Sequence, residues 1–309
     1  MFFLLPILLA GALQSAAPPA PPPPPAPPAP SSYVPVRVYD TKAGAFVDFE
    51  VMLVSAAKAD VIFVGEQHND SNTHRLEAAL VDGLDRRKIR PVVSLEMFER
   101  DVQPVIDSYV SGRASEEELL KTARPWPRYA TDYRPLVEAA KQRGWPVVAA
   151  NVPRRIASAV AKSGKDAIAQ LPEADRLFVA RDLDCPRDTY FDRFAVTMTG
   201  HPGGTQTADE KQAMTERYYW AQCVKDETMA ESIVAALEKS GGPLVHYNGA
   251  FHSDFGLGTA ERVRRRAPAR RVVVISMLPV ADLDTLTPAG EDLKRADYLV
   301  YTTSTPKGF

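Results

Sequence analysis

The chain has 309 residues, 45% of them hydrophobic and 25% charged, which is the composition of an ordinary globular protein with length for one large or two modest domains. Its formal net charge of −2 and isoelectric point of about 6.2 lack the basic excess of a nucleic-acid-binding domain, so no nucleic-acid partner is expected. The basic run at residues 262–271 is the one exception, and it predicts a solvated helix end.

Residues 1–17 predict a secretory signal peptide. They begin MFFLLPILLA, an apolar run of about a dozen residues that is too short to span a bilayer, and small residues follow it. We expect a mature protein that begins between residues 11 and 20, is periplasmic or secreted, and lacks a cysteine for lipid attachment. No basic residue precedes the apolar run, so a membrane anchor or an unstructured tail stays open as an alternative.

Residues 18–32 are almost entirely proline and alanine. This composition cannot build a core and predicts an extended polyproline II linker of about 40 Å, at about 3.1 Å per residue. Its deletion is therefore expected to leave the thermal midpoint of the folded part, residues 33–306, unchanged within about one degree.

The folded part alternates apolar runs with helical patterns. The continuous apolar runs are typical of strands covered on both faces, and they occupy residues 60–66, 91–98, 145–152, 243–249, 271–280 and 297–303. Residues 101–131 and 164–240 have helical spacing without a strand, and the last helix has a predicted buried stripe from Met214 and Tyr218 to Leu237. The sequence thus predicts an α/β fold with a mostly parallel sheet flanked by helices and an inserted helical subdomain at about residues 164–240.

Polar residues follow four of these runs where the predicted strands end. Glu66 and His68 follow the first run, Glu96 ends the second, Asn151 follows the third, and His252 follows the fourth. Because ligands of open α/β sheets bind at the carboxyl ends of the strands, we expect the two histidines and the two glutamates to line one pocket.

Two kinds of chemistry suit these groups. Glu66, His68 and His252 are candidate ligands of a divalent metal, since imidazole and carboxylate suit borderline ions. Glu66 or His68 could instead be the base of a hydrolase. Gly65 and Gly249 precede the polar groups, where glycine permits positive φ and a close approach of backbone.

Structural roles are expected for the remaining candidates. His74 falls on the polar side of its helical pattern, which predicts a solvated side chain, whereas His246 lies within a predicted strand and belongs to the core. Glu96 could also be structural, with Arg75 or Arg100 neutralising its charge.

The chain has two cysteines, Cys185 and Cys223. An oxidising compartment would permit them to pair, and closure of this loop would stabilise the protein by about 3 to 4 kcal/mol. The sequence alone leaves the pairing open.

Several blocks together resemble the ChaN-like haem-binding proteins, over nearly all of residues 34–303. The blocks are VGEQHNDSNTHRLEAAL, SLEMFERDVQPVID, WPRYATDYRPLVEAAKQRGWPVVAANVPR, MAESIVAAL, NGAFHSD and ADYLVYT. The family shares a superfamily with Tiki-type metalloproteases and erythromycin esterases. The resemblance implies an exported α/β protein that binds haem, in some members as a dimer with two haems face to face. Many members are lipoproteins, and this chain departs from them because it lacks the cysteine.

Carried over by position, the resemblance assigns Glu66, His68 and Glu96 to the strand-end acids and first histidine of the family, and His252 to its later histidine. In the Tiki branch the two histidines would ligate a metal. In the haem-binding branch a tyrosine holds the iron.

The resemblance does not indicate which tyrosine this is, and Tyr133 and Tyr190 are the candidates, although each could instead pack against the sheet with its hydroxyl bonded. Arg154 and Arg155 could pair with the haem propionates. The expected haem-binding set is therefore His68, Glu96, Tyr133, Asn151, Arg154, Tyr190 and His252.

The function expected from this resemblance is that of an exported haem-binding protein in haem or iron uptake or storage. Its expected partners are haem, a second copy of the chain and an outer-membrane haem or iron receptor. A metal-dependent or Glu/His hydrolase is the alternative, and a structural protein with a degenerate pocket is a third.

Overall fold

The computed structural model describes residues 35–200, 207–288 and 290–304. The predicted signal peptide and the proline-rich linker lie outside the described residues. Within the described part of the chain, no helix is long and apolar enough to cross a membrane.

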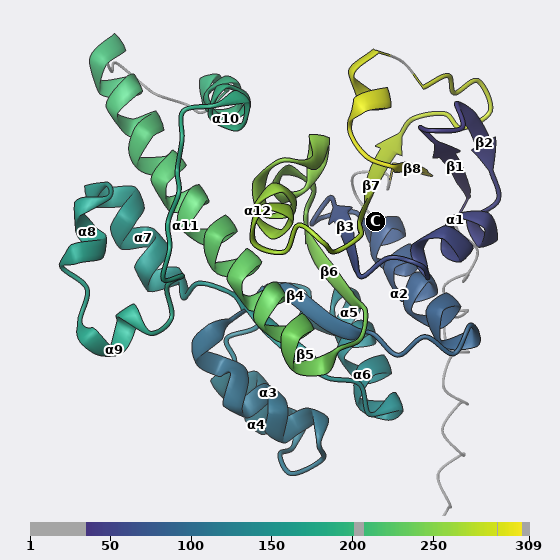
Figure 1. Cartoon of the computed structure of the whole chain (residues 1–309), viewed down its shortest axis with the longest axis horizontal. Coiled ribbons are helices and arrows are strands. Elements are labelled where there is room, and N and C mark those ends of the chain that lie inside the picture. Colours follow the sequence, from purple (N-terminus) through teal and green to yellow (C-terminus); the bar gives the residue numbers. More distant parts are fainter. Residues whose placement is uncertain (1–34, 201–206, 289, 305–309) are drawn as a thin grey trace, which may run out of the picture. The chain divides into compact units, whose positions relative to one another are not determined.

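An eight-stranded sheet forms the centre of the fold (Figure 1). Its strands are β1 (Val36–Asp40), β2 (Ala45–Val47), β3 (Val61–Glu66), β4 (Val92–Glu99), β5 (Val147–Asn151), β6 (Leu244–Gly249), β7 (Val272–Val280) and β8 (Tyr298–Thr303). They are ordered β2-β1-β8-β7-β3-β6-β4-β5. Neighbours from β8 to β5 are parallel, whereas β1 runs antiparallel to β2 and to β8.

The predicted α/β fold with a mostly parallel sheet is confirmed. All six apolar runs form strands, β3 to β8, at nearly the predicted bounds. The sequence did not predict β1 and β2, because these two edge strands are short and largely half-buried and so lack a continuous apolar run.

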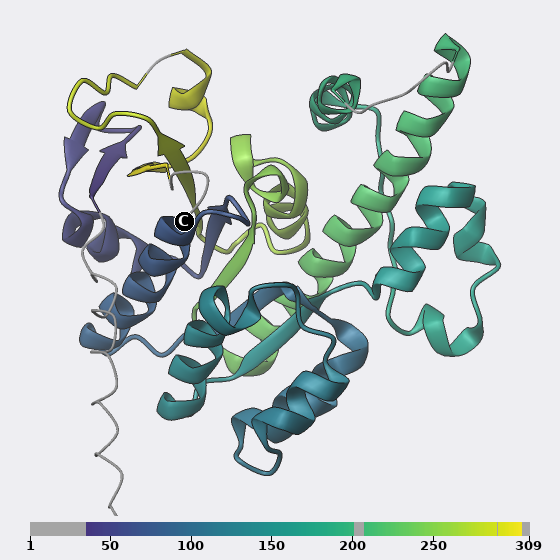
Figure 2. The same cartoon turned by 180° about the vertical axis from the view of Figure 1, so that it is seen from behind.

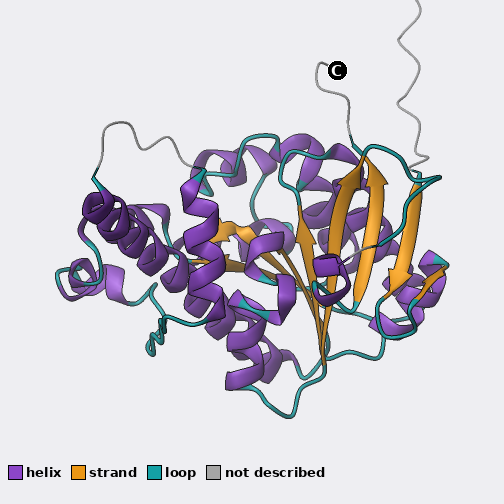
Figure 3. Ribbon diagram, turned by 90° about the horizontal axis from the view of Figure 1, so that it is seen from above, coloured by secondary structure: helices purple, strands orange, loops and turns teal. Residues whose placement is uncertain are grey.

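Helices cover both faces of the sheet (Figure 3). Those before β5 are α1 (Phe49–Ala56), α2 (Ser71–Arg86), η1 (Arg100–Val102), α3 (Gln103–Val110), α4 (Glu116–Thr122), α5 (Tyr129–Asp132) and α6 (Arg134–Arg143). Alternate side chains of β3 point to opposite faces of the sheet. Ile62 and Val64 belong to the core that packs against α1 and α2. Phe63 joins a second core with the later helices.

Only helices connect β5 to β6 among the described residues, as the sequence predicted. They are α7 (Arg154–Ser163), α8 (Asp166–Ala169), α9 (Glu173–Arg176), α10 (Thr189–Thr199) and α11 (Ala208–Ser240), and α7 packs along α11 (Figure 2). After β6 come η2 (Ala250–His252), η3 (Asp254–Gly256), α12 (Gly258–Arg266) and η4 (Gly290–Lys294).

The long helix α11 has clear start and stop signals. Thr207 and Glu210 form a capping box at its beginning, and Gly241 ends it with a φ of 64°. Leu237 is buried as predicted, but Tyr218 is 41% exposed and Met214 is half-buried. The first third of α11 therefore lies away from the sheet, which the uniform helical period could not indicate.

The basic run is not a simple solvated helix end. Arg262 is buried, and its Nε lies 3.1 Å from Oε1 of the buried Glu227. Arg265 and Arg266 pair with the same carboxylate, so three cations of α12 hold α11, and of these the Arg265 side chain also stays 41% exposed.

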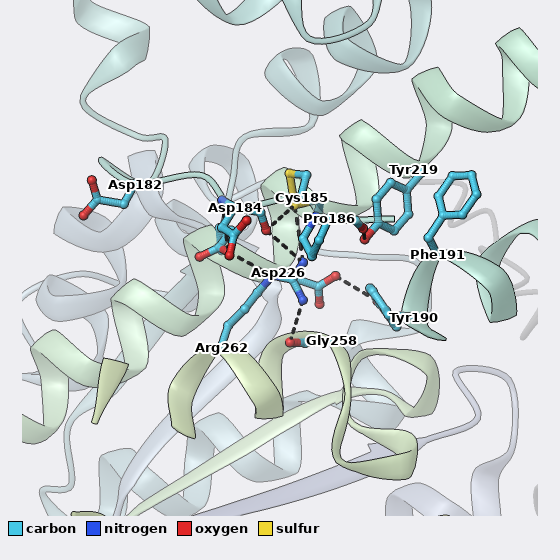
Figure 4. Close-up of a disulfide and its surroundings, with 12 residues drawn as sticks. Asp182, Asp184, Cys185, Pro186, Tyr190, Phe191, Tyr219, Asp226, Gly258 and Arg262 are labelled. Atoms are coloured by element: carbon cyan, nitrogen blue, oxygen red, sulfur yellow. Dashed lines mark hydrogen bonds and ion pairs between the residues drawn. A yellow bond between two sulfur atoms is a disulfide. The ribbon is translucent and has the colours of Figure 1, made fainter. Parts of the chain in front are cut away.

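A disulfide joins Cys185 to Cys223, so the loop before α10 is tied to α11 (Figure 4). The pairing that the sequence left open is therefore present in the folded chain.

Candidate functional site

The strand order brings the predicted site residues to one edge of the sheet. Because β6 lies between β3 and β4, the carboxyl ends of these three strands are neighbours. Glu66 ends β3 and Gly249 ends β6. Glu96 lies where the pairing of β4 with β5 is interrupted, between Leu95 and Glu99.

Gly249, at the end of β6, is approached from both sides by side chains that follow β3 and belong to β4. Its backbone N–H donates to Glu96 Oε2 at 2.7 Å. A Cβ on this residue would lie 2.6 Å from His68 Nε2, so only glycine leaves room for the His68 ring, whereas its 3.7 Å distance to Glu96 Oε2 would be an ordinary contact. The expected positive φ is wrong, since its φ is −55°, and the close approach alone explains the glycine.

His252 is held between two carboxylates. Its Nδ1 lies 2.7 Å from Asp226 Oδ1, and its Nε2 lies 3.3 Å from Glu96 Oε1. Burial opposes the charged imidazole, but the two carboxylates outweigh it and raise the pKa of His252 to about 10. Burial likewise opposes ionisation of Glu96, yet the facing imidazolium holds the pKa of this carboxyl well below its usual range.

Asp226, on α11, collects further hydrogen bonds. Tyr190 donates its hydroxyl to Asp226 Oδ2 at 2.8 Å (Figure 4). Thr259 donates to Oδ1 of the same carboxylate at 2.7 Å. Burial and the charge of Asp226 raise the pKa of Tyr190 well above its ordinary value. The phenol is therefore neutral and engaged, which does not suit the role of an iron-bound phenolate.

His68 and Glu66 form a second pair at the same edge. His68 Nδ1 lies 2.5 Å from Glu66 Oε1, and Tyr133 donates its hydroxyl to the same oxygen at 2.8 Å. Burial lowers the pKa of His68, but the bond to Glu66 and the charge of Glu96 raise it overall. The His68 side chain is 45% exposed and its ring contacts Trp126 edge-on.

The expected solvated position of His74 is wrong. The side chain is buried, with Nδ1 2.9 Å from Glu77 Oε2 and Nε2 3.2 Å from the backbone oxygen of His68. Asp70 caps α2, so the first turn of this helix presses against the carboxyl edge of the sheet. The spacing of His74, Glu77, Val81 and Leu84 was the available signal, because it marks one face of a helix.

One set of metal-ligating groups stands out among the described residues. Glu66, His74 and Glu77 have ligand atoms that all lie within 4.8 Å of one another. The predicted set of Glu66, His68 and His252 is not brought together in this way, since Glu96 and Asp226 occupy the two nitrogens of His252.

A cavity of about 330 Å³ lies beside His252 and opens between α7, α10 and α11. Gln222 lines it and reaches His252 Nδ1 at 3.3 Å. Its lining comprises Glu99, Trp126, Asn151, Val152, Arg154, Ala157, Ser158, Ala161, Phe194, Met198, Tyr218, Ala221, Gln222 and Lys225.

Only some of the predicted ligand-binding residues line this cavity. Asn151 and Arg154 line it, and the amide of Asn151 also donates to the backbone oxygen of Glu96 at 3.0 Å. Arg155 does not, because it pairs with Asp101 at 2.6 Å and Asp175 at 2.7 Å.

The sequence interpretation did not assign Glu77, Asp226 or Tyr218 to the site, and it also missed the cavity-lining residues Phe194, Met198, Gln222 and Lys225. Asp226 lies on the same helical stripe as Met229, Ile233 and Leu237, so a carboxylate on an otherwise apolar face was a usable signal. Tyr218 was instead assigned to the core, and no periodicity could show that it faces a cavity.

Known proteins share this fold. Residues 52–263 match the family described as haem-binding uptake, Tiki superfamily, ChaN. The chain is similar to a solved structure described as "Cofacial heme binding to ChaN of Campylobacter jejuni", with a TM-score of 0.61 and 18% identity over 87% of this chain and 97% of that chain.

More distant similarities have lower scores. A Bacillus cereus protein matches with a TM-score of 0.48 and 10% identity, over 82% of this chain and 91% of that chain. An erythromycin esterase mutant in its open conformation matches with a TM-score of 0.45 and 12% identity, over 84% of this chain and 80% of that chain. No curated protein matches the sequence.

Proposed function

The chain belongs to the haem-binding uptake family of the Tiki superfamily, with ChaN, and from this premise we propose that it binds haem in the cavity beside His252. Its role would be haem or iron uptake or storage outside the cytoplasm. The lining of the cavity is the observation that supports this proposal best.

Haem requires apolar walls, a ligand for iron and cations for its propionates. Phe194 and Met198 from α10 and Ala157 from α7 supply apolar walls. Arg154 and Lys225 are cations in the same lining. This combination fits a flat, apolar, dianionic ligand.

Tyr218 is the phenol best suited to the iron. It lines the cavity and is 41% exposed, whereas Tyr133 and Tyr190 are buried and donate to carboxylates. Burial and the charge of Glu66 also raise the pKa of Tyr133, which disfavours its phenolate. We therefore replace the two tyrosines expected from the sequence with Tyr218.

Titration of the full chain with ferric haem tests this proposal. We expect a Soret band that saturates and a visible spectrum typical of tyrosine ligation. Tyr218→Phe should lose that ligand signature, whereas Tyr133→Phe and Tyr190→Phe should retain it. A wild-type protein that leaves the haem spectrum unchanged would refute haem binding, and an unaltered spectrum in Tyr218→Phe would reassign the ligand.

Export is also part of the proposal, and the disulfide between Cys185 and Cys223 supports it because disulfides persist in oxidising compartments. Mass spectrometry of the secreted or periplasmic fraction should find an N-terminus between residues 11 and 20. An intact Met1 in the cytosol would contradict export.

A haem-dependent homodimer and an outer-membrane receptor are the partners that we propose. The cofacial haem binding described for ChaN of Campylobacter jejuni supports two haems meeting between copies. Size-exclusion chromatography with light scattering should detect a dimer when haem is added and a smaller species without it.

A hydrolase is the second candidate, because a half-exposed His68 bonded to Glu66 is a plausible acid–base pair. Turnover of small aryl esters, lost in Glu66→Gln, would support it. His252 is a poorer base, since its raised pKa keeps it protonated at neutral pH.

A further inference from the structure

We propose that Glu66, His74 and Glu77 form a site for one divalent first-row transition-metal ion, separate from the haem cavity. None of the three residues lines that cavity, so the inference does not depend on haem binding. The residues come from the end of β3 and the first two turns of α2.

The distances between donor atoms fit one ion. His74 Nδ1 lies 2.9 Å from Glu77 Oε2 and 3.5 Å from Glu66 Oε2. Ligands about 2.0 to 2.2 Å from a tetrahedral zinc are separated from each other by about 3.4 Å. The two His74 distances bracket this value, and all three ligand atoms lie within 4.8 Å of one another, so one ion can be shared among them after a local adjustment of the side chains.

The contacts of His74 Nε2 favour the tautomer in which Nδ1 can ligate a metal. Nε2 faces the backbone oxygen of His68 at 3.2 Å and Asp132 Oδ2 at 3.4 Å, and both are acceptors. A proton on Nε2 satisfies these acceptors, and Nδ1, which lies 2.9 Å from Glu77 Oε2, must then share either a proton or a metal ion with the glutamates. A ligating histidine whose other nitrogen donates to a carbonyl or carboxylate is the usual arrangement of metal sites.

Asp132 is itself held in position. Its Oδ2 lies 2.7 Å from the Nε of Arg128, and Nη1 of the same guanidinium donates to the backbone oxygen of Asn69. The outer contacts of the site are thus fixed, so His74 cannot rotate freely away from the glutamates.

The glutamates supply the observation that points to a ligand. Glu66 Oε2 and Glu77 Oε1 are buried and have no hydrogen-bond partner, although both residues are at most 1% exposed. Burial of such atoms without a partner costs free energy. Three acceptors converge here, so a positive charge is needed among them, and it is either a metal ion or a shared proton.

The donors select the class of ion. One imidazole nitrogen and two carboxylate oxygens suit zinc, ferrous iron or manganese, whereas calcium prefers oxygen ligands alone. His68, whose side chain is 45% exposed and bonded to Glu66, lies between the cluster and solvent.

The test uses the haem-free full chain, stripped with a chelator and titrated with Zn²⁺ by calorimetry, with metal content counted by mass spectrometry. We expect one zinc per chain. Glu77→Gln keeps the shape of the side chain but removes the anionic ligand, so it should weaken binding by about 100-fold or more. His252→Gln, which alters the other cluster, should retain the wild-type affinity.

Four outcomes would overturn the proposal. A wild-type protein that binds no Zn²⁺, Mn²⁺ or Fe²⁺ would assign the cluster to a shared proton. Full binding in Glu77→Gln, or loss in His252→Gln, would assign the metal to other ligands. If Glu77→Gln fails to fold, the absorption of bound Co²⁺ in the wild type decides, because a spectrum lacking an imidazole nitrogen would exclude His74.

Discussion

At the scale of single residues, His252 is the clearest case of a side chain whose state is set by its neighbours. Asp226 and Glu96 face its two nitrogens, and Gln222 contacts the ring from the cavity side. The charge of Lys225 lowers the pKa of Glu96 further, which keeps this carboxylate ionised beside the ring. Protonation of the buried His252 therefore contributes to the free energy of folding, so this free energy should depend on pH.

The free energy of unfolding should fall as pH rises from about 6.5 toward 10. The folded pKa of His252 is raised to about 10, so the stabilisation is fully present below the unfolded value and is lost as pH passes the folded one. Urea unfolding of wild type and His252→Gln across this range checks it. The difference in unfolding free energy between wild type and His252→Gln should shrink at high pH. A difference that stays constant with pH would contradict the assignment.

Asp226→Asn should cost about 3 to 5 kcal/mol of stability at neutral pH. It removes one partner of a buried ion pair and leaves His252 with less compensation. Asp282→Asn is the matched control, because Asp282 is exposed and bonded only within its own loop. Equal unfolding free energies for the two variants would show that the buried pair contributes little.

At the scale of elements, the site depends on three strand ends that the sequence located well. Glu66, Glu96 and His252 could be placed together because apolar runs mark parallel strands and parallel strands share an edge. The position of His74 could not, because it depends on how α2 packs on the sheet. The position of Asp226 was harder still to predict, because it lies on α11 and reaches His252 only through the packing of that helix on the sheet.

Gly249→Ala should destabilise the protein by about 1 to 3 kcal/mol and shift His68. The added methyl would lie 2.6 Å from His68 Nε2, while Glu96 keeps its bond to the backbone N–H. Thermal unfolding and the imidazole resonances of His68 in nuclear magnetic resonance measure both effects. Gly242→Ala is the control, because its nearest neighbour would be 3.8 Å away. Equal behaviour of the two variants would contradict the crowding argument.

At the scale of the whole described chain, the proposed haem cavity combines helices between β5 and β6 with residues from earlier in the chain. Its walls come from α7, α10 and α11, Glu99 and Asn151 come from the ends of β4 and β5, and Trp126 comes from the segment before α5. The disulfide between Cys185 and Cys223 ties the segment leading into α10 to α11. Its loss should therefore affect both the stability of the fold and the cavity.

Replacement of both cysteines by serine should lower the free energy of unfolding by about 3 to 4 kcal/mol, because the unfolded chain regains the freedom of the closed loop. Haem affinity should fall with it, since Phe194 and Met198 on α10 form one wall of the cavity. The wild type treated with a reductant is the matched comparison and should behave like the variant. If stability falls but haem binds with unchanged affinity, α10 is positioned by its contacts with Tyr219 and Phe251 alone, and the disulfide serves the fold without serving the cavity.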